Sequence, residues 1–126
     1  MNMNSTAIKQ ARKAIESLYD STCTIIEYEE KKDPVTKKTA GKEITVYQDK
    51  PCRLSYSSNK KSDQSEVANV VTQIIKVFIA PELDIKAGSK LVVTKKSRTV
   101  EYKNSGKPAI YDTHQEIVLE LFKGWA

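Results

Sequence analysis

The chain has 126 residues and a mass of 14.2 kDa, enough for one compact domain and too little for two. Hydrophobic residues make up 39% of it and charged residues 29%, a balance typical of a soluble domain with a small core. No apolar stretch approaches the roughly 20 residues that a membrane-spanning helix requires. The N-terminal segment also lacks the apolar core of a signal peptide. We therefore expect one cytoplasmic domain, residues 1–126, with no membrane anchor.

The net charge of +5 is unevenly distributed along the chain. Residues 86–107 hold seven basic residues and one acidic residue, Glu101. A concentrated basic face favours contact with phosphates or with an acidic protein surface, although most such faces are simply solvated. The residues that we single out as possible contacts to DNA or to a partner are Lys90, Lys95, Lys96, Arg98 and Lys103.

The first segment has a helical pattern. Ile8, Ala11, Ile15 and Leu18 recur at spacings of three and four, which predicts an amphipathic helix over residues 5–19. The apolar stripe is narrow and built partly from alanine. It suits packing against one sheet edge or against a neighbouring subunit.

After residue 20 the apolar period changes to two, which is typical of strands. The strand-like segments are TCTIIEYE, EITVYQ, PCRLSY, IIKVFIA, KLVVTKK, RTVEYK and HQEIVLELF. Asp33-Pro34 and Gly41 are expected to interrupt regular structure, and Lys95-Lys96-Ser97 to form a hairpin tip. One helix followed by about six to seven short strands predicts a mainly β fold, as a small antiparallel barrel or sandwich.

Alternation also predicts which side chains are buried. In the last segment Ile117, Leu119 and Leu121 point to one face, so this strand is half-buried. Cys23 and Cys52 face the same way as apolar neighbours. We expect two buried thiols there rather than a disulfide or a zinc site.

One long segment, Ser57–Gln73, does not fit the strand pattern. Its first ten residues have no aliphatic or aromatic side chain, and Lys60 and Lys61 offset Asp63 and Glu66. Connections of this length inside a compact domain are mobile, functional, or both. It is either a surface loop without a role or a loop that orders only against a partner or another copy of the chain.

Catalytic signatures are incomplete. His114-x-Glu116 opens the zinc deaminase signature, but the required Pro-Cys-x-x-Cys is missing, because Pro51-Cys52 is followed by Ser55 and comes earlier in the chain. The four glycines are widely separated, so neither a phosphate-binding loop nor a nucleophile elbow is present. We expect no enzyme, no cofactor and no metal. His114 then has a hydrogen-bonding role in the turn before the last strand.

A set of turn residues occupies the C-terminal third of the chain. It consists of Asp84-Ile85-x-x-Gly88-Ser89, Tyr102, Ser105-Gly106-x-Pro108, Tyr111 and His114-x-Glu116, with the earlier strand PCRLSY at residues 51–56. These features resemble the head-tail stopper, head-completion or head-tail joining proteins of tailed bacteriophages, and closely those of PBSX-type defective prophages. The resemblance covers about residues 22–122, and its motifs are structural turns rather than chemical sites.

The resemblance implies a compact β-barrel that joins a twelve-fold ring of copies beneath the portal. Its partners would be the portal-bound adaptor ring protein, a tail completion or tail-tube protein, and passing double-stranded DNA held without sequence preference. It would occupy the bacterial host cytoplasm and then the virion neck. In such proteins a long loop lines or closes the DNA channel. Here that position falls on residues 57–73, with a gating segment of Ser58, Asn59, Lys60, Lys61, Ser62, Asp63, Gln64, Ser65 and Glu66.

A second interpretation comes from a different class, a sequence-independent nucleic-acid-binding β-barrel of cellular type. Tyr102 and Tyr111 lie near the basic segment, as a single-strand binder requires, but aromatic residues total only 7%. The predicted helix has mixed charge and no row of arginines for reading base edges. The sequence therefore favours at most nonspecific contact with backbone phosphates.

Overall fold

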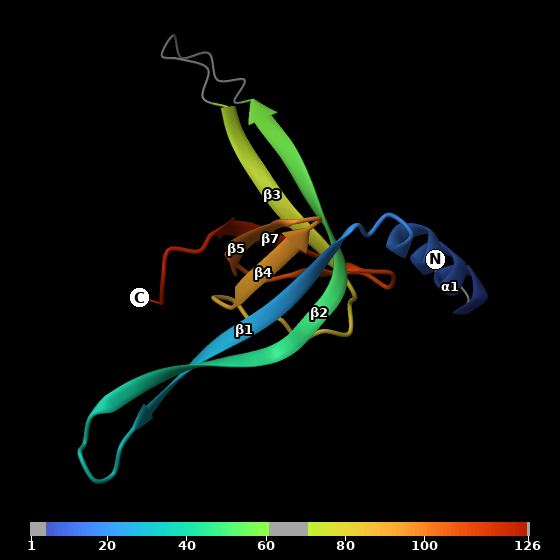
Figure 1. Ribbon diagram of the computed structural model, residues 1–126. Helices are drawn as coiled ribbons and strands as arrows, with labels where there is room; N and C mark the ends of the chain where they lie inside the picture. Colours follow the sequence, from blue (N-terminus) through green and yellow to red (C-terminus); the bar gives the residue numbers. More distant parts are fainter. Residues whose placement is uncertain (1–4, 61–70, 126) are drawn as a thin grey trace.

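The computed structural model describes residues 5–60 and 71–125 of the chain. Within them, one helix precedes seven strands (Figure 1). The elements are α1 (Ser5–Glu16), β1 (Ser21–Lys32), β2 (Thr39–Lys60), β3 (Val71–Ile79), β4 (Lys90–Lys95), β5 (Arg98–Asn104), β6 (Ala109–Ile110) and β7 (Gln115–Leu121). The predicted mainly β fold with one N-terminal helix is confirmed.

All seven strands belong to one sheet, and every pairing is antiparallel. The order is β3-β2-β1-β4-β5-β7-β6, and β3 also pairs with β7. The sheet therefore curls until its first strand meets one of its last. β2 is shared between two neighbours: Thr39–Cys52 pairs with β1, and Cys52–Lys60 pairs with β3.

The inner face of the curled sheet holds the core. The buried apolar side chains are Cys23, Ile25, Cys52, Val77, Ile79, Ile85, Leu91, Val93, Tyr102, Ile117 and Leu119. The expected inward alternation of the first and last strands is confirmed except at Leu121, which is 57% exposed. β3 pairs with β7 only as far as Leu119, so Leu121 has no neighbour on that side.

Both cysteines are free and fully buried, as the alternation predicted. The thiols of Cys23 and Cys52 face one another. The contact with Cys52 and burial together raise the pKa of Cys23. In this structure they act as small apolar core residues.

The helix is shorter than expected and lies to one side of the sheet (Figure 1). It ends at Glu16 rather than residue 19, because Leu18 and Tyr19 make tighter turn hydrogen bonds. No helix residue is buried, and Leu18 is 58% exposed. The Arg12 guanidinium holds the helix to the sheet by pairing with the Glu82 carboxylate, with Nη2 and Oε2 2.9 Å apart.

Two ribbons of paired strand project from the core in different directions (Figure 1). The first, the β1–β2 arm, is residues 28–46, and every one of them is exposed. The second, the β2–β3 ribbon, pairs Ser57–Lys60 with Val71–Ile74. The prediction of a loop over Ser57–Gln73 is wrong at both ends, where the chain is strand. Lys61, Ser62, Asp63, Gln64, Ser65 and Glu66 lie outside the described residues.

The expected turn at Asp33-Pro34 ends the arm, where Asp33 N donates to Lys38 O at 2.8 Å. Gly41, expected to break structure, instead lies inside β2. The ring of Tyr28 covers Gly41, so a side chain there would overlap the Tyr28 hydroxyl. An aromatic ring over a strand glycine buries backbone that would otherwise be exposed.

A cluster of C-terminal aromatic residues holds the base of the arm. Trp125 stacks on Tyr28 with ring centroids 5.0 Å apart, and Phe122 meets Trp125 edge-on at 4.9 Å. The Trp125 Nε1 also donates a hydrogen bond to Glu43 Oε2 at 2.9 Å. We call Tyr28, Glu43, Phe122 and Trp125 the arm clamp. It ties both strands of the arm to the C-terminal segment.

We predict that Gly41→Ala disrupts the arm clamp. The added methyl group must displace the Tyr28 ring, so the stack on Trp125 is lost at a cost of about 0.5–1.5 kcal/mol. Trp125 is the chain's single tryptophan, so its fluorescence reports on the clamp directly. We expect the emission to move to longer wavelength and the melting temperature to fall. Gly106→Ala is the control, because a methyl group there meets nothing within 4 Å. Identical emission from the two variants would contradict the clamp.

Candidate functional site

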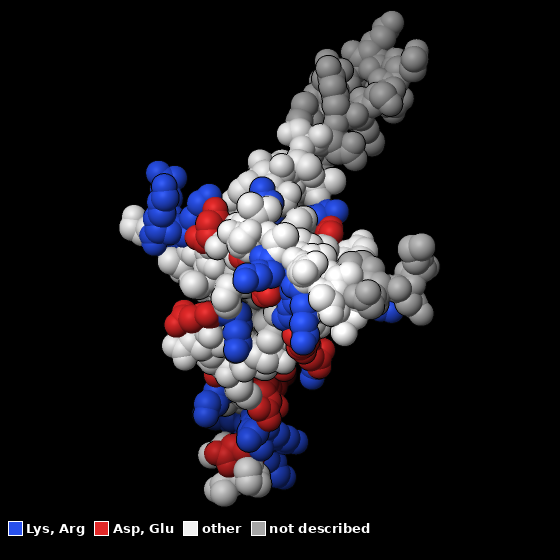
Figure 2. Space-filling view, turned by 90° about the vertical axis from the view of Figure 1, so that its right-hand side faces the viewer, with Lys and Arg blue, Asp and Glu red and all other residues white. Residues whose placement is uncertain are grey.

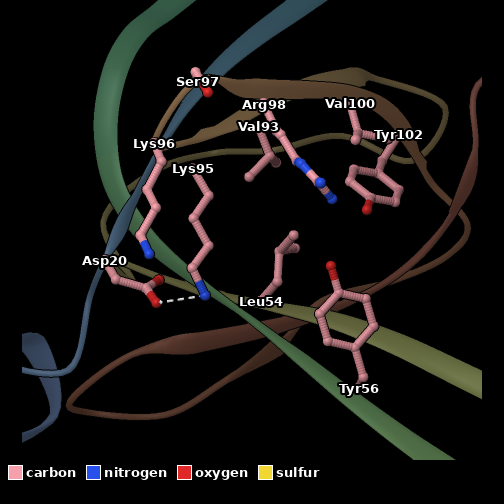
Figure 3. Close-up of a pocket in the computed structure, with 10 residues that line it drawn as sticks. All are labelled: Asp20, Leu54, Tyr56, Val93, Lys95, Lys96, Ser97, Arg98, Val100 and Tyr102. Carbon is pink, nitrogen blue, oxygen red and sulfur yellow. Dashed lines mark ion pairs between the residues drawn. The ribbon is translucent and has the colours of Figure 1, made fainter.

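The candidate site is a cavity of about 540 Å³ at the end of the curled sheet, where the start of β1, the second half of β2 and the β4–β5 hairpin come together (Figure 3). We call it the mouth pocket. Its lining combines apolar, phenolic and cationic side chains: Asp20, Leu54, Tyr56, Val93, Lys95, Lys96, Ser97, Arg98, Val100 and Tyr102.

The β4–β5 hairpin forms one wall of the mouth pocket, and its turn is the Lys96-Ser97 tip predicted from sequence. Val93 pairs with Val100, and Lys95 pairs with Arg98 two positions further on. Alternation places all four side chains on the same, inner face of the sheet. That face is buried at Val93, which is 2% exposed, and cationic at the tip. The core is therefore not closed by apolar residues at this end.

The opposite wall comes from β2. Leu54 and Tyr56 lie two residues apart on one face of that strand, and Tyr56 is 56% exposed. The hydroxyl groups of Tyr56 and Tyr102 point toward one another across the pocket, with Arg98 directed into the same space (Figure 3). Burial, together with the Tyr56 hydroxyl, raises the pKa of Tyr102 to about 12.

The charges at the rim are unequal. Lys95 pairs with Asp20 at 3.0 Å, and this contact is the main cause of the lowered pKa of Asp20. Among the described residues, no acidic side chain forms an ion pair with Lys96 or Arg98. The rim therefore carries two cations that no described acidic residue neutralises.

The five predicted basic contacts are thus separated by the fold. Lys95, Lys96 and Arg98 meet at the mouth pocket, whereas Lys90 and Lys103 do not. The Lys90 side chain is only 10% exposed, and Lys103 lies 4.0 Å from Glu120.

Lys90 is one of the residues that attach the arm to the sheet, and it is not part of an exposed binding face. Its ammonium lies 2.9 Å from Glu43 and 3.2 Å from Glu101, and it sits 4.8 Å from the centroid of Phe122. The hydrogen bond to Glu43 is the main cause of its raised pKa. Lys90 therefore links the arm clamp to β4 and cannot contact DNA or a partner in this arrangement.

Four of the turn residues that carried the resemblance hydrogen-bond to Asn104, a buried residue that sequence reasoning missed: Ile85, Gly88, Ser89 and Gly106. Asn104 is 1% exposed, and its Nδ2 donates to the carbonyls of Ile85 and Lys86 at 3.2 and 3.1 Å. Its Oδ1 accepts from Gly106 N at 3.0 Å. Gly88 has a φ of 85°, a conformation that favours glycine, and its N donates to the Asn104 carbonyl at 2.9 Å. Pro108 follows Gly106, just before β6.

His114 has the hydrogen-bonded surroundings of a structural residue. Its Nε2 lies 2.9 Å from Glu116 Oε2, and its Nδ1 lies 2.9 Å from the Thr113 hydroxyl. The ring stacks on Tyr111 at 5.0 Å, and the Tyr111 N donates to the His114 carbonyl at 2.8 Å. Lys76 approaches the same Glu116 carboxylate at 3.6 Å. These contacts fasten the turn that leads into β7.

Gln115 is a second buried amide that the sequence did not reveal. It is fully buried, and its Nε2 donates to the carbonyls of Ala80 and Leu83, both at 2.8 Å. The available signal was its position, because Gln115 precedes Ile117 and Leu119 on the inward-facing row of β7. A polar residue at an inward position must be hydrogen-bonded there.

Residues 5–60 and 71–125 contain no cluster of three or more histidine, cysteine, aspartate or glutamate side chains placed to hold a metal ion. Within the same residues, the helix is neither long nor apolar enough to cross a membrane.

Comparisons with known proteins identify no family for the chain. No family model matches the chain, and no curated protein matches it. Among solved structures, it is similar to the phage-like element PBSX protein xkdH from Bacillus subtilis, with 15% sequence identity and a TM-score of 0.49. The match covers 80% of this chain and 93% of that one. Similarity at this level assigns neither a family nor a function.

We predict that Lys90 and Lys96 differ sharply in their effect on stability. Lys90→Met leaves the Glu43 and Glu101 carboxylates without their shared cation and should lower the free energy of unfolding by about 1–3 kcal/mol. The same substitution at exposed Lys96 should change it by less than about 0.5 kcal/mol. Urea denaturation of both variants measures the difference. Equal losses would show that Lys90 is not a structural cation.

We further predict that stability falls above pH 10. Tyr102 and Tyr19 both have a pKa raised to about 12 by burial, against an ordinary value of 10.0. The unfolded chain therefore loses these protons first, and the stability they provide, full below pH 10, is lost as the pH rises toward 12. Denaturation midpoints across this range should fall less steeply for Tyr102→Phe. An unchanged slope would contradict the buried phenol.

Proposed function

We propose that the chain is a structural, non-enzymatic neck protein of a tailed phage or prophage, joining a DNA-filled head to a tail as one copy in a ring. The observation that carries the proposal is the exposure of the long β1–β2 arm, beside a second ribbon, β2–β3, that projects from the core in another direction (Figure 1). A two-stranded ribbon is marginally stable by itself in water, and its open edges tend to pair with other chains. Residues 28–46 are all exposed, and apart from the arm clamp they have no cover in the described part of the chain. Neighbouring subunits would supply it.

The positions of the motifs that resemble those of head-tail stopper proteins support the same proposal. Gly88 and Gly106 hydrogen-bond to Asn104, and His114 contacts both Tyr111 and Glu116 in the turn before β7. These residues fix loops on a curled sheet and do not surround a reactive group. A scaffold of this kind is what the resemblance to head-tail stopper proteins implies.

In the proposed ring the curled sheet acts as a small barrel, with the adaptor ring above it and tail proteins below. The β2–β3 ribbon is the element directed toward the channel, where double-stranded DNA passes without sequence-specific contact. In this proposal the channel-lining part of the predicted gating segment begins at Ser58, Asn59 and Lys60, which belong to strand β2. The rest of that segment lies outside the described residues.

The alternative is sequence-independent nucleic-acid binding in a cell, and one observation favours it. The end of the β1–β2 arm, residues 31–42, holds five lysines and one aspartate, all exposed. Basic side chains gather at this end of the molecule in Figure 2. Neutralising four or five phosphates would give a salt dependence with a slope of about −4 in a logarithmic plot for duplex DNA.

The neck role is tested by deleting the coding sequence from the prophage that carries it and inspecting the particles by electron microscopy. We expect heads without tails, and tailed particles again when the intact chain is supplied in trans. Normal tailed particles from the deletion strain would contradict the proposal. Micromolar binding of the purified chain to random duplex, with the steep salt slope above, would then favour the cellular alternative.

A further inference from the structure

We propose that the mouth pocket binds an extended acidic segment of an adjoining protein, with one apolar side chain inserted between β2 and β5 and carboxylates at Lys96 and Arg98. The inference deepens the proposed neck role, because it assigns a partner chemistry to one surface of the subunit. It is argued from the shape, lining and charge of the pocket.

The interior of the pocket is suited to an apolar side chain. Val93 and Tyr102 are 2% and 4% exposed at its floor, whereas Val100 and Tyr56 remain 38% and 56% exposed at its walls. A cavity of about 540 Å³ lies within the usual range of ligand sites. Inserting one side chain would remove the exposed apolar walls from water, which is the main favourable contribution to such contacts.

The rim is suited to carboxylates. Asp20 already neutralises Lys95, so Lys96 and Arg98 provide the excess charge. Arg98 points into the pocket toward the two phenol hydroxyls (Figure 3). A guanidinium presents a planar set of donors that matches a carboxylate, and it is less strongly hydrated than an ammonium. An acidic side chain two positions from the inserted apolar one lies on the same face of an extended segment, so it would meet Arg98 in a partly desolvated setting.

The backbone beside the pocket is suited to an extended segment. β5 pairs with β4 along Arg98–Lys103, but β7 pairs with β5 only over Tyr102–Asn104. In the part of the chain that the structure describes, Arg98–Val100 thus has a strand on one side alone. An extended peptide could add to this open edge and place alternate side chains into the pocket, which is a common mode of peptide recognition.

Duplex DNA fits this surface less well. Its phosphates lie on a convex surface and its bases are stacked inside, so nothing apolar would enter between Leu54 and Val100. The lysines at the end of the arm, which project into solvent, are better placed for that contact. An acidic protein segment uses both the apolar interior and the cationic rim.

The test uses the full chain and a fluorescein-labelled eight-residue peptide, measured by fluorescence anisotropy. The peptide repeats leucine, serine, glutamate and serine, so that leucine and glutamate share one face of the extended segment. We expect saturable binding that weakens at least tenfold in the double variant Lys96→Glu, Arg98→Glu. The control is Lys37→Glu, Lys38→Glu, which makes the same change in net charge at the end of the arm and should alter binding less than twofold. The same peptide with serine in place of each leucine should bind at least tenfold more weakly than the leucine peptide.

Three results would overturn the proposal. They are no saturable binding up to millimolar peptide, equal weakening by the two double variants, and equal affinity for the serine and leucine peptides. A single-stranded thymidine oligonucleotide that binds wild type and loses affinity in the mouth variant alone would instead assign the pocket to nucleic acid. These measurements are independent of the neck role, which depends on the particles formed by the deletion strain.

Discussion

The structure depends on one long strand that changes partner in its middle. β2 pairs with β1 up to Cys52 and with β3 from Cys52 onward, so this fully buried residue lies where both pairings meet. The core assembles around that crossing, because only there do strands lie on both sides of β2. Away from it, each half of β2 keeps a single neighbour along much of its length and becomes a ribbon. The small core and the two projecting ribbons are therefore consequences of the same constraint.

Polar groups, rather than additional apolar surface, fix the connections around this core. The side-chain amides of Asn104 and Gln115 hold the connection between β3 and β4 at two places along its length. Lys90 does the same for the arm through Glu43. Buried polar groups specify a geometry because each unmade hydrogen bond is costly. The mouth is the exception, since the inner row ends there in Lys95 and Arg98 and remains open. The mouth pocket is therefore one place where another molecule could complete the core.

The pattern of apolar residues predicted those features of the fold that depend on neighbouring residues in the chain. The inward rows of β1 and β7 followed from alternation because those strands have one buried and one solvated face. The ends of the segment 57–73 were predicted as loop because residues such as Ser57 and Ser58 are polar and exposed, so backbone pairing holds this part of β2 without an apolar pattern. Lys90 could not be separated from Lys96 by sequence, because its partner Glu43 is 47 residues away and is brought near only by the fold. The mouth pocket was partly predictable, since its three cations were singled out, but its opposite wall, Leu54 and Tyr56, comes from a strand far away in the chain.

The arm clamp joins parts of the chain that are far apart. Trp125 and Glu43 are separated by 82 residues, while the arm itself closes through a short turn at Asp33. Hairpins of this kind form within about 1–10 μs, whereas contacts between distant residues are slow because a long loop must close first. We therefore expect the strands of the β1–β2 hairpin to pair early, and the direction of the arm to be set later, when the C-terminal segment docks. The strand pairing of the arm would then form early in folding and its orientation late.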